Sequence, residues 1–111
     1  LVKVVMGDKG NALYFSRSII PYVRSTDWHH WLEKQTFYTH VGIYAYRRDV
    51  LSAIASLPQS PLELAESLEQ LRWLSAGYTI RMAVTNEPTI GIDTPADLEA
   101  AVEYLKQHPQ E

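Results

Sequence analysis

The stretch that decides the fold is Pro61-Leu62-Glu63-Leu64-Ala65-Glu66-Ser67-Leu68-Glu69-Gln70-Leu71-Arg72-Trp73-Leu74. Leu64, Leu68 and Leu71 follow one another at spacings of four and three residues, so the pattern predicts one amphipathic helix. Ser60 precedes it as a helix cap, with proline at the first helical position and Glu63 at the third as the capping-box partner of Ser60. Glu66, Glu69 and Gln70 fall at i, i+3 and i+4 on a single face. Two acids and an amide on one face are suited to bind hydroxyl groups or a cation, although an ordinary solvated helix face is the alternative.

Strands and further helices alternate on both sides of this helix. The sequence predicts strands over 1–6, 12–15, 38–46 and 78–84, and helices over 47–57 and 95–107. The turn cluster at 7–11 predicts a hairpin, whereas residues 25–37 have no clean period and are typical of a surface excursion. This order of elements predicts an α/β fold with a mixed sheet and flanking helices.

Composition narrows the class of protein. At 111 residues the chain is one domain or a piece of one, and its net charge of -3 argues against a nucleic-acid partner. It has no cysteine, which excludes disulfides and thiolate metal sites and fits a reducing compartment. No apolar run reaches the roughly 18 residues of a membrane span, and no signal peptide is present. We therefore expect a soluble, cytoplasmic protein with no membrane partner.

The first residue is a separate observation. The chain opens on Leu1 in a strand-like segment, without an initiator methionine. We therefore expect it to be cut from a longer protein.

A carboxylate stands directly before the last predicted helix. Asp93 precedes Thr94, the expected cap of that helix, and Asp97 serves its first turn as Glu63 serves that of the earlier helix. A carboxylate in this position is favoured by the helix dipole, so a structural role is one interpretation. The other is a Mg²⁺ or substrate site, because ligands of α/β folds bind beyond the carboxyl ends of strands and Mg²⁺ prefers oxygen ligands.

Two arginines follow the second predicted strand. Arg17 lies at its end and Arg24 comes seven residues later. The forked donors of arginine suit a substrate carboxylate or phosphate, and surface solubility is the alternative.

Two ring side chains flank a glycine in the predicted strand 38–46. His40 and Tyr44 share a face on either side of Gly42, which is typical of a small ligand platform. Tyr38 and Tyr46 lie on the same face, so an aromatic core face remains open as the competing interpretation. The chain contains no glycine-rich phosphate loop and no convincingly spaced Ser/His/Asp grouping, hence no recognisable nucleotide-binding element.

Four stretches, in order, resemble the C-terminal half of the CMP-KDO synthetases (3-deoxy-manno-octulosonate cytidylyltransferases). They are residues 12–18 with 20–22, 40–47, 60–63 with 68–72, and 91–98. The resemblance implies part of a nucleotide-diphospho-sugar-transferase-like (Rossmann-like) fold. It also implies a reaction in which CTP and the acid sugar KDO give CMP-KDO and pyrophosphate with Mg²⁺, in lipopolysaccharide biosynthesis.

The resemblance carries specific roles onto matching residues. It implies that Asp93 is a Mg²⁺ ligand and that Arg17 and Arg24 lie near the KDO carboxylate. It also implies a sugar pocket lined by His40, Tyr44, Glu69 and Gln70. It implies no catalytic residue within this chain.

The departures from the family are equally specific. The loop that holds CTP and the second metal-binding aspartate belong to the family's N-terminal half and have no counterpart in these 111 residues. We therefore expect residues 1–111 to form a single domain, the KDO-binding and dimerisation part, which is inactive alone. The resemblance further implies a homodimer through the aromatic excursion, with Trp28, Trp31, Phe37 and Tyr38 as candidate contacts.

Two rival interpretations remain open. The chain could belong to a cytidylyltransferase of another acid sugar, although the motifs at 68–72 and 91–98 favour KDO over sialic acid. It could instead be a non-catalytic dimerisation or carbohydrate-binding module.

Overall fold

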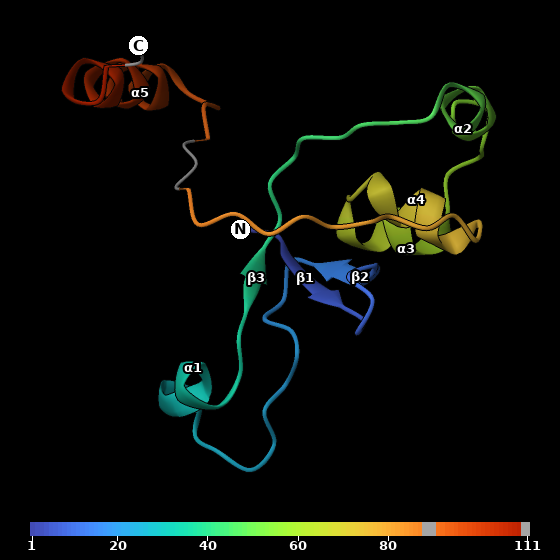
Figure 1. Cartoon of the computed structure of the whole chain (residues 1–111), viewed down its shortest axis with the longest axis horizontal. Coiled ribbons are helices and arrows are strands. Elements are labelled where there is room, and N and C mark those ends of the chain that lie inside the picture. The colour runs from blue at the N-terminus through green and yellow to red at the C-terminus, as the bar shows by residue number, and fades with distance from the viewer. Residues whose placement is uncertain (88–90, 110–111) are drawn as a thin grey trace.

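A small antiparallel sheet lies at the centre of the computed structural model, which describes residues 1–87 and 91–109. Strands β1 (Lys3–Met6) and β2 (Ala12–Ser16) form a hairpin, and β3 (Tyr38–Thr39) pairs with the other edge of β1. The strand order is therefore β2-β1-β3 (Figure 1). Gly10 adopts a φ of 84°, which closes the hairpin turn at little steric cost. The predicted hairpin is confirmed.

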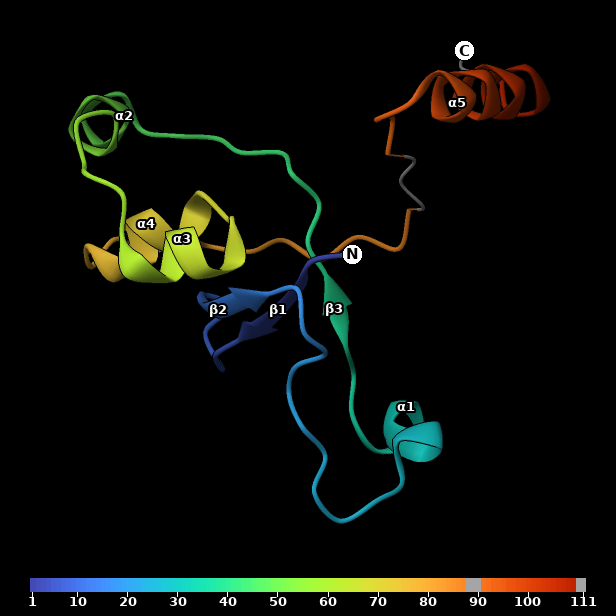
Figure 2. The same ribbon diagram turned by 180° about the vertical axis from the view of Figure 1, so that it is seen from behind.

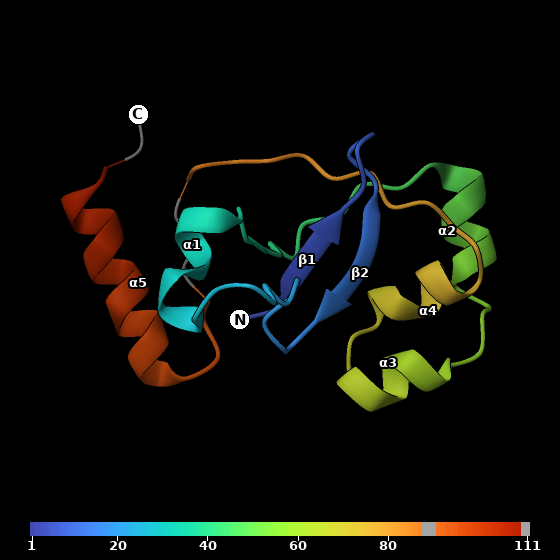
Figure 3. The ribbon, with the colours of Figure 1, turned by 90° about the horizontal axis from the view of Figure 1, so that it is seen from below.

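Some of the helices pack on or near this sheet and others lie away from it. In chain order they are the 3₁₀ turn η1 (Trp28–His30), α1 (Trp31–Lys34), α2 (Arg48–Ile54), α3 (Pro61–Glu66), α4 (Gln70–Ser75) and α5 (Pro95–Gln107). Helix α4 packs against β2, and α3 runs beside α4 (Figures 1 and 2). Helix α5 lies well away from both of them (Figures 1 and 3). The α/β class, the helix at 95–107 and the excursion at 25–37 are as the sequence predicts. The predicted mixed sheet does not form among the described residues, because β2 and β3 both pair antiparallel with β1.

The prediction of one helix over 61–74 is wrong, because the chain forms two helices with a break at Ser67. Ser67 adopts the left-handed conformation, with φ 55° and ψ 46°. In a continuous helix the carbonyls of Glu66 and Ser67 would accept from backbone N–H groups four residues later. Here both carbonyls accept instead from the Arg17 guanidinium, at 2.6 and 3.0 Å. A tertiary partner therefore takes over the acceptors that a longer helix would use.

The predicted strands at 38–46 and 78–84 form only in part. Ladder pairing of the first stops at Thr39, and the second contributes one isolated bridge between Arg81 and Asn11. Residues 41–47 and 83–87 are free of ladder pairing within the described part of the chain. A strand needs a neighbour to satisfy its backbone groups, so these two segments stay outside the sheet.

Most of the buried core lies between the hairpin and α4. The buried cluster consists of Val4, Ala12, Phe15, Leu68 and Leu71, and both Phe15 and Leu71 are 0% exposed. The remainder is open: the radius of gyration is 16.7 Å, against about 13 Å for a compact domain of this length. The accessible surface of 8902 Å² likewise exceeds the roughly 6,200 Å² typical of this mass. The well-packed part of the chain is therefore the hairpin together with α3 and α4.

None of the helices within residues 1–87 and 91–109 combines the length and apolar character that crossing a membrane requires.

Candidate functional site

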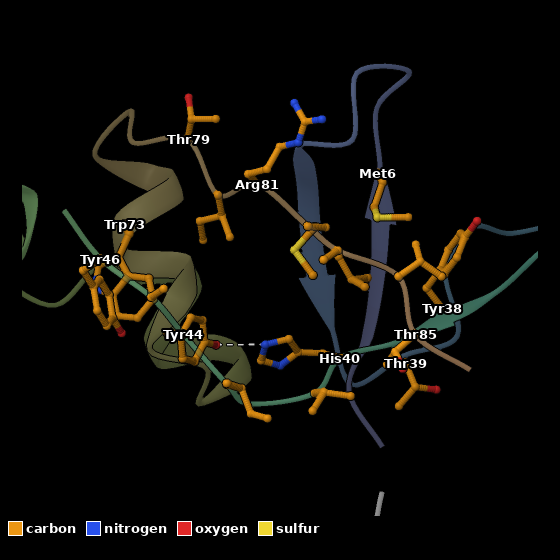
Figure 4. A pocket seen from close by; sticks show the side chains of 18 of the residues that line it. Met6, Tyr38, Thr39, His40, Tyr44, Tyr46, Trp73, Thr79, Arg81 and Thr85 are labelled. Carbon is orange, nitrogen blue, oxygen red and sulfur yellow. Dashed lines mark hydrogen bonds between the residues drawn. The ribbon is translucent and has the colours of Figure 1, made fainter. Parts of the chain in front are cut away.

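A pocket of about 1440 Å³ opens beside the sheet, between the two extended segments that follow β3 and α4 (Figure 4). Val4 and Met6 of β1 contribute to its lining, and Trp73 of α4 stands at one end. His40, Tyr44 and Tyr46 enter from the segment after β3. The pocket is therefore lined from three parts of the chain that are distant in sequence.

His40 and Tyr44 are in direct contact. The Tyr44 hydroxyl lies 3.0 Å from His40 Nε2 (Figure 4). In a straight strand the two Cα atoms would stand about 13 Å apart, too far for this bond. A hydrogen bond of 2.8 Å from the Ile43 N–H to the Val41 carbonyl bends the chain at Gly42. The two side chains thus lie together, but through a bend rather than on one face of the predicted strand.

Both groups of this pair stay uncharged at neutral pH. Burial lowers the pKa of His40, since it disfavours the imidazolium. Burial, followed by the neighbouring Tyr46 and Glu69, raises the pKa of Tyr44 to about 12. A neutral imidazole beside a protonated phenol offers hydrogen-bond donors and acceptors together, which suits the hydroxyl groups of a ligand.

An aromatic wall continues from this pair. Trp73 makes edge contacts with Tyr44 and Tyr46 at centroid distances of 5.2 and 5.7 Å, and the two tyrosines stack at 6.0 Å. Phe15 lies edge-on to His40 at 4.9 Å. The sequence interpretation missed Trp73 as a pocket residue. Its position next to the leucine stripe of the predicted helix was the available signal.

The break at Ser67 redistributes the predicted polar face. Glu66 turns to β2, where Oε1 accepts from Ser16 and Arg17. Glu69 precedes α4, is exposed, and raises the pKa of Tyr46 after the larger effect of burial. Gln70 is only 5% exposed. The prediction that the three side chains share one face is therefore wrong, and only Glu69 acts electrostatically on the pocket tyrosines.

The remaining site candidates lie elsewhere among the described residues. Arg17 is exposed and contacts the end of α3 through its guanidinium. Arg24 is exposed in the segment between β2 and η1. Asp93 is exposed before α5, and its backbone N–H donates to Asp97 Oδ2 at 3.1 Å. None of these three belongs to the described lining of the pocket, and neither do Glu69 and Gln70.

The fit of Mg²⁺ to this chain is partial. Residues 1–87 and 91–109 hold no group of three or more His, Asp or Glu side chains that could bind a metal ion. Mg²⁺ often takes one or two carboxylates and completes its shell with water and substrate phosphates. The single carboxylate of Asp93 fits one position of such a shell.

The α3–α4 pair that carries Glu69 is held by an ion pair. Arg72 Nε donates to Glu63 Oε2 at 2.7 Å and its Nη2 donates to Oε1. Glu63 also accepts from the Ser60 N–H, completing the predicted capping box. The hydrogen bond from Arg72 is the largest cause of the lowered pKa of Glu63.

The Arg72–Glu63 pair predicts a pH dependence. A lowered folded-state pKa contributes stability that is present above about pH 4.5 and is lost as pH falls through the folded-state value. We expect Arg72→Met to lower the melting temperature at pH 7 and to reduce its further drop between pH 5 and 3. Melting curves of Arg48→Met, at an exposed arginine, are the control. Equal melting temperatures for Arg72→Met and the unmodified chain at pH 7 would contradict this.

Comparison with known proteins identifies similar sequences. The family model described as "Cytidylyltransferase" matches residues 1–82. The 3-deoxy-manno-octulosonate cytidylyltransferase of Phocaeicola vulgatus is 61% identical over 109 residues, which cover 98% of this chain and 43% of that protein. The enzyme of the same name from Bacteroides thetaiotaomicron is 60% identical over 104 residues, covering 94% and 42%.

A solved structure is also similar. It is described as CMP:2-keto-3-deoxy-manno-octonic acid synthetase complexed with CTP, and it matches with a TM-score of 0.78 and 50% sequence identity. The match covers 96% of this chain and 42% of the other. The chain thus spans less than half the length of the relatives it matches.

Proposed function

Because the chain belongs to the cytidylyltransferase family, we propose that it forms the sugar-binding part of a 3-deoxy-manno-octulosonate cytidylyltransferase. The observation that carries this proposal is the neutral His40–Tyr44 pair beside Glu69, in a chain 61% identical to an enzyme of that name. The whole reaction joins CMP from CTP to KDO and releases pyrophosphate. We place it in the cytoplasm, as a step of lipopolysaccharide biosynthesis.

The His40–Tyr44 pair of the pocket and four polar residues outside its described lining would together bind and orient the sugar. Tyr44 and His40 would hydrogen-bond hydroxyl groups, and Glu69 and Gln70 would complete the polar side of the site. Arg17 still has three of its five N–H donors after bonding two carbonyls, enough for a bidentate bond to the KDO carboxylate. Arg24 would add a second positive charge near it.

Positioning is the main contribution that these residues would make to the chemistry. The anomeric hydroxyl of KDO attacks the α-phosphorus of CTP, the new P–O bond replaces the bond to pyrophosphate, and the hydroxyl proton is lost. Holding the sugar in one orientation lowers the entropic part of this barrier. Asp93 would hold Mg²⁺ together with substrate oxygens, and the ion would neutralise charge on the triphosphate.

KDO binding tests the proposal. We expect KDO to shift the amide NMR signals of residues 40–46 and 69–70 in a saturable manner, with a smaller response to sialic acid. A chain whose signals do not respond to KDO would overturn the sugar-binding role. Equal responses to both acids would instead favour a cytidylyltransferase of a different acid sugar.

The chain alone is expected to be inactive. Incubated with CTP, KDO and Mg²⁺ it should release no pyrophosphate above the blank, because the sequence lacks a phosphate-binding glycine loop and offers one candidate metal carboxylate. The Phocaeicola vulgatus enzyme, assayed in parallel, controls for reagents and detection. Pyrophosphate release well above blank would refute this expectation.

A homodimer is the second expectation, and it also suits the rival role of a dimerisation or carbohydrate-binding module. The excursion exposes Trp28 and Leu32 at 67% and 80%, and Tyr22 just before it is 76% exposed. Trp31 instead packs against Tyr22 and against Phe37 of the excursion. We expect a dimer mass in sedimentation at tens of micromolar and a monomer mass for the Trp28→Ala, Leu32→Ala double variant. A monomeric unmodified chain would contradict this.

A further inference from the structure

Glu66 joins the end of β2 to the end of α3. Its Oε1 accepts hydrogen bonds from the Ser16 hydroxyl and from the Arg17 backbone N–H, both at 2.9 Å. Ser16 is 3% exposed, and its oxygen also accepts from the Ser18 N–H at 3.0 Å. One carboxylate therefore fixes the backbone on the exit from β2, across 50 residues of sequence.

Arg17 returns this contact from its side chain. Its Nε donates to the Glu66 carbonyl at 2.6 Å and its Nη2 donates to the Ser67 carbonyl at 3.0 Å. Carbonyls at a helix C-terminus lack intrahelical partners and carry partial negative charge, so a guanidinium suits them. The Glu66 side chain thus accepts from the Arg17 backbone, and the Arg17 side chain donates to the Glu66 backbone.

We propose that Glu66 is a positioning residue of the sugar site, which sets the direction in which the remaining N–H donors of Arg17 point. This inference rests on the proposed function. Glu66 acts through Arg17 and makes no contact with the sugar itself. The same clasp fixes the left-handed turn at Ser67, from which the chain leads to Glu69 and Gln70. A single carboxylate thereby aligns the two sides of the polar site.

The charge state of Glu66 offers a direct readout. Burial raises the pKa of Glu66. Hydrogen bonds from the Arg17 N–H, Ser16 and Tyr14, together with the positive charge of Arg17, lower it by more, so the pKa of Glu66 is lowered overall. Arg17 and Tyr14 are therefore the titratable groups that face it. Because the Arg17 amide donates to this carboxylate, its proton resonance reports when the carboxylate is neutralised.

The first arm of the test does not depend on sugar binding. In ¹H–¹⁵N spectra from pH 7 to 3, we expect the Arg17 amide of the unmodified chain to shift with a midpoint below 4.5. Glu66→Gln should abolish that titration. Glu63→Gln, the matched change of the other carboxylate on α3, should leave it in place because Glu63 pairs with Arg72.

The second arm measures KDO affinity. Glu66→Ala removes both acceptor oxygens, and we expect it to raise the Kd for KDO about tenfold or more. Glu66→Gln keeps one carbonyl acceptor and should recover part of that loss, whereas Glu99→Gln, at an exposed carboxylate of α5, should stay within about twofold of the unmodified chain. If Glu66→Ala does not fold, the ratio of the Kd values of Glu66→Gln and Glu99→Gln is measured in its place.

The outcomes separate the two proposals. An Arg17 amide that ignores pH, or a folded Glu66→Ala chain that binds KDO as the unmodified chain does, overturns the positioning role. An unmodified chain that does not bind KDO overturns the proposed function. In that case the Arg17 amide titration of the unmodified chain, Glu66→Gln and Glu63→Gln still shows, without any sugar, whether the Glu66 carboxylate binds Arg17.

Discussion

Replacing Phe15 by alanine is expected to lower the free energy of unfolding by about 3–5 kcal/mol. Phe15 is 0% exposed in the cluster that joins the hairpin to α4, and its ring also contacts His40 edge-on at 4.9 Å. The total stability of a small domain is only about 5–15 kcal/mol. The loss is therefore a large part of what holds this chain folded, and urea unfolding followed by circular dichroism measures it.

The neighbouring leucine provides the matched control for this prediction. Leu13 lies on the same strand two residues away and is 64% exposed. Leu13→Ala should change the unfolding free energy by less than about 0.5 kcal/mol. Equal losses for the two variants would show that the hairpin–α4 contact is not the main source of stability.

Replacing His40 by alanine is expected to raise the Kd for KDO about tenfold or more. The change removes the partner of the Tyr44 hydroxyl and the ring that packs on Phe15. Binding can be measured by isothermal titration calorimetry, with His108→Ala as the control because His108 lies exposed at the end of α5. Unchanged KDO affinity in a folded His40→Ala chain would remove this pair from the sugar site.

His40 also predicts a pH effect on stability. Its pKa is lowered by burial, so the unfolded chain takes up a proton below about pH 6.5 that the folded chain resists. The stability contribution of neutral His40 is therefore complete above that pH and falls as the solution is acidified towards the folded-state pKa. We expect melting curves of His40→Ala to show a smaller change in melting temperature between pH 7 and 5 than those of the unmodified chain.

Local rules predicted those features that depend on neighbouring residues alone. The capping boxes of Ser60 with Glu63 and of Thr94 with Asp97 are both formed. Each needs only residues three apart, so the sequence contains all the information. The helix break at Ser67 needed Arg17, a residue 50 positions away, to supply donors for the carbonyls. No pattern within residues 61–74 could have revealed that competitor.

The candidate site was likewise predictable only where it depends on residues close together in the sequence. The spacing around Gly42 placed His40 and Tyr44 on one face, but their contact required the bend made by the hydrogen bond from Ile43 to Val41. The aromatic wall needed α4 to be rotated against the extended segment, which depends on where the helix starts again after Ser67. Site positions that combine distant segments follow from packing and not from periodicity.

The two extended segments beside the pocket have a consequence for how this chain behaves at high concentration. Backbone donors and acceptors that face outward from a strand-like segment are templates for pairing with another chain, and such edges promote aggregation. The second segment reads Tyr-Thr-Ile-Arg-Met-Ala-Val-Thr over residues 78–85, an apolar and β-prone run interrupted by one charge. Arg81 is that charge, and it is exposed. The colloidal stability of the isolated chain therefore depends strongly on this single arginine, which acts as a gatekeeper.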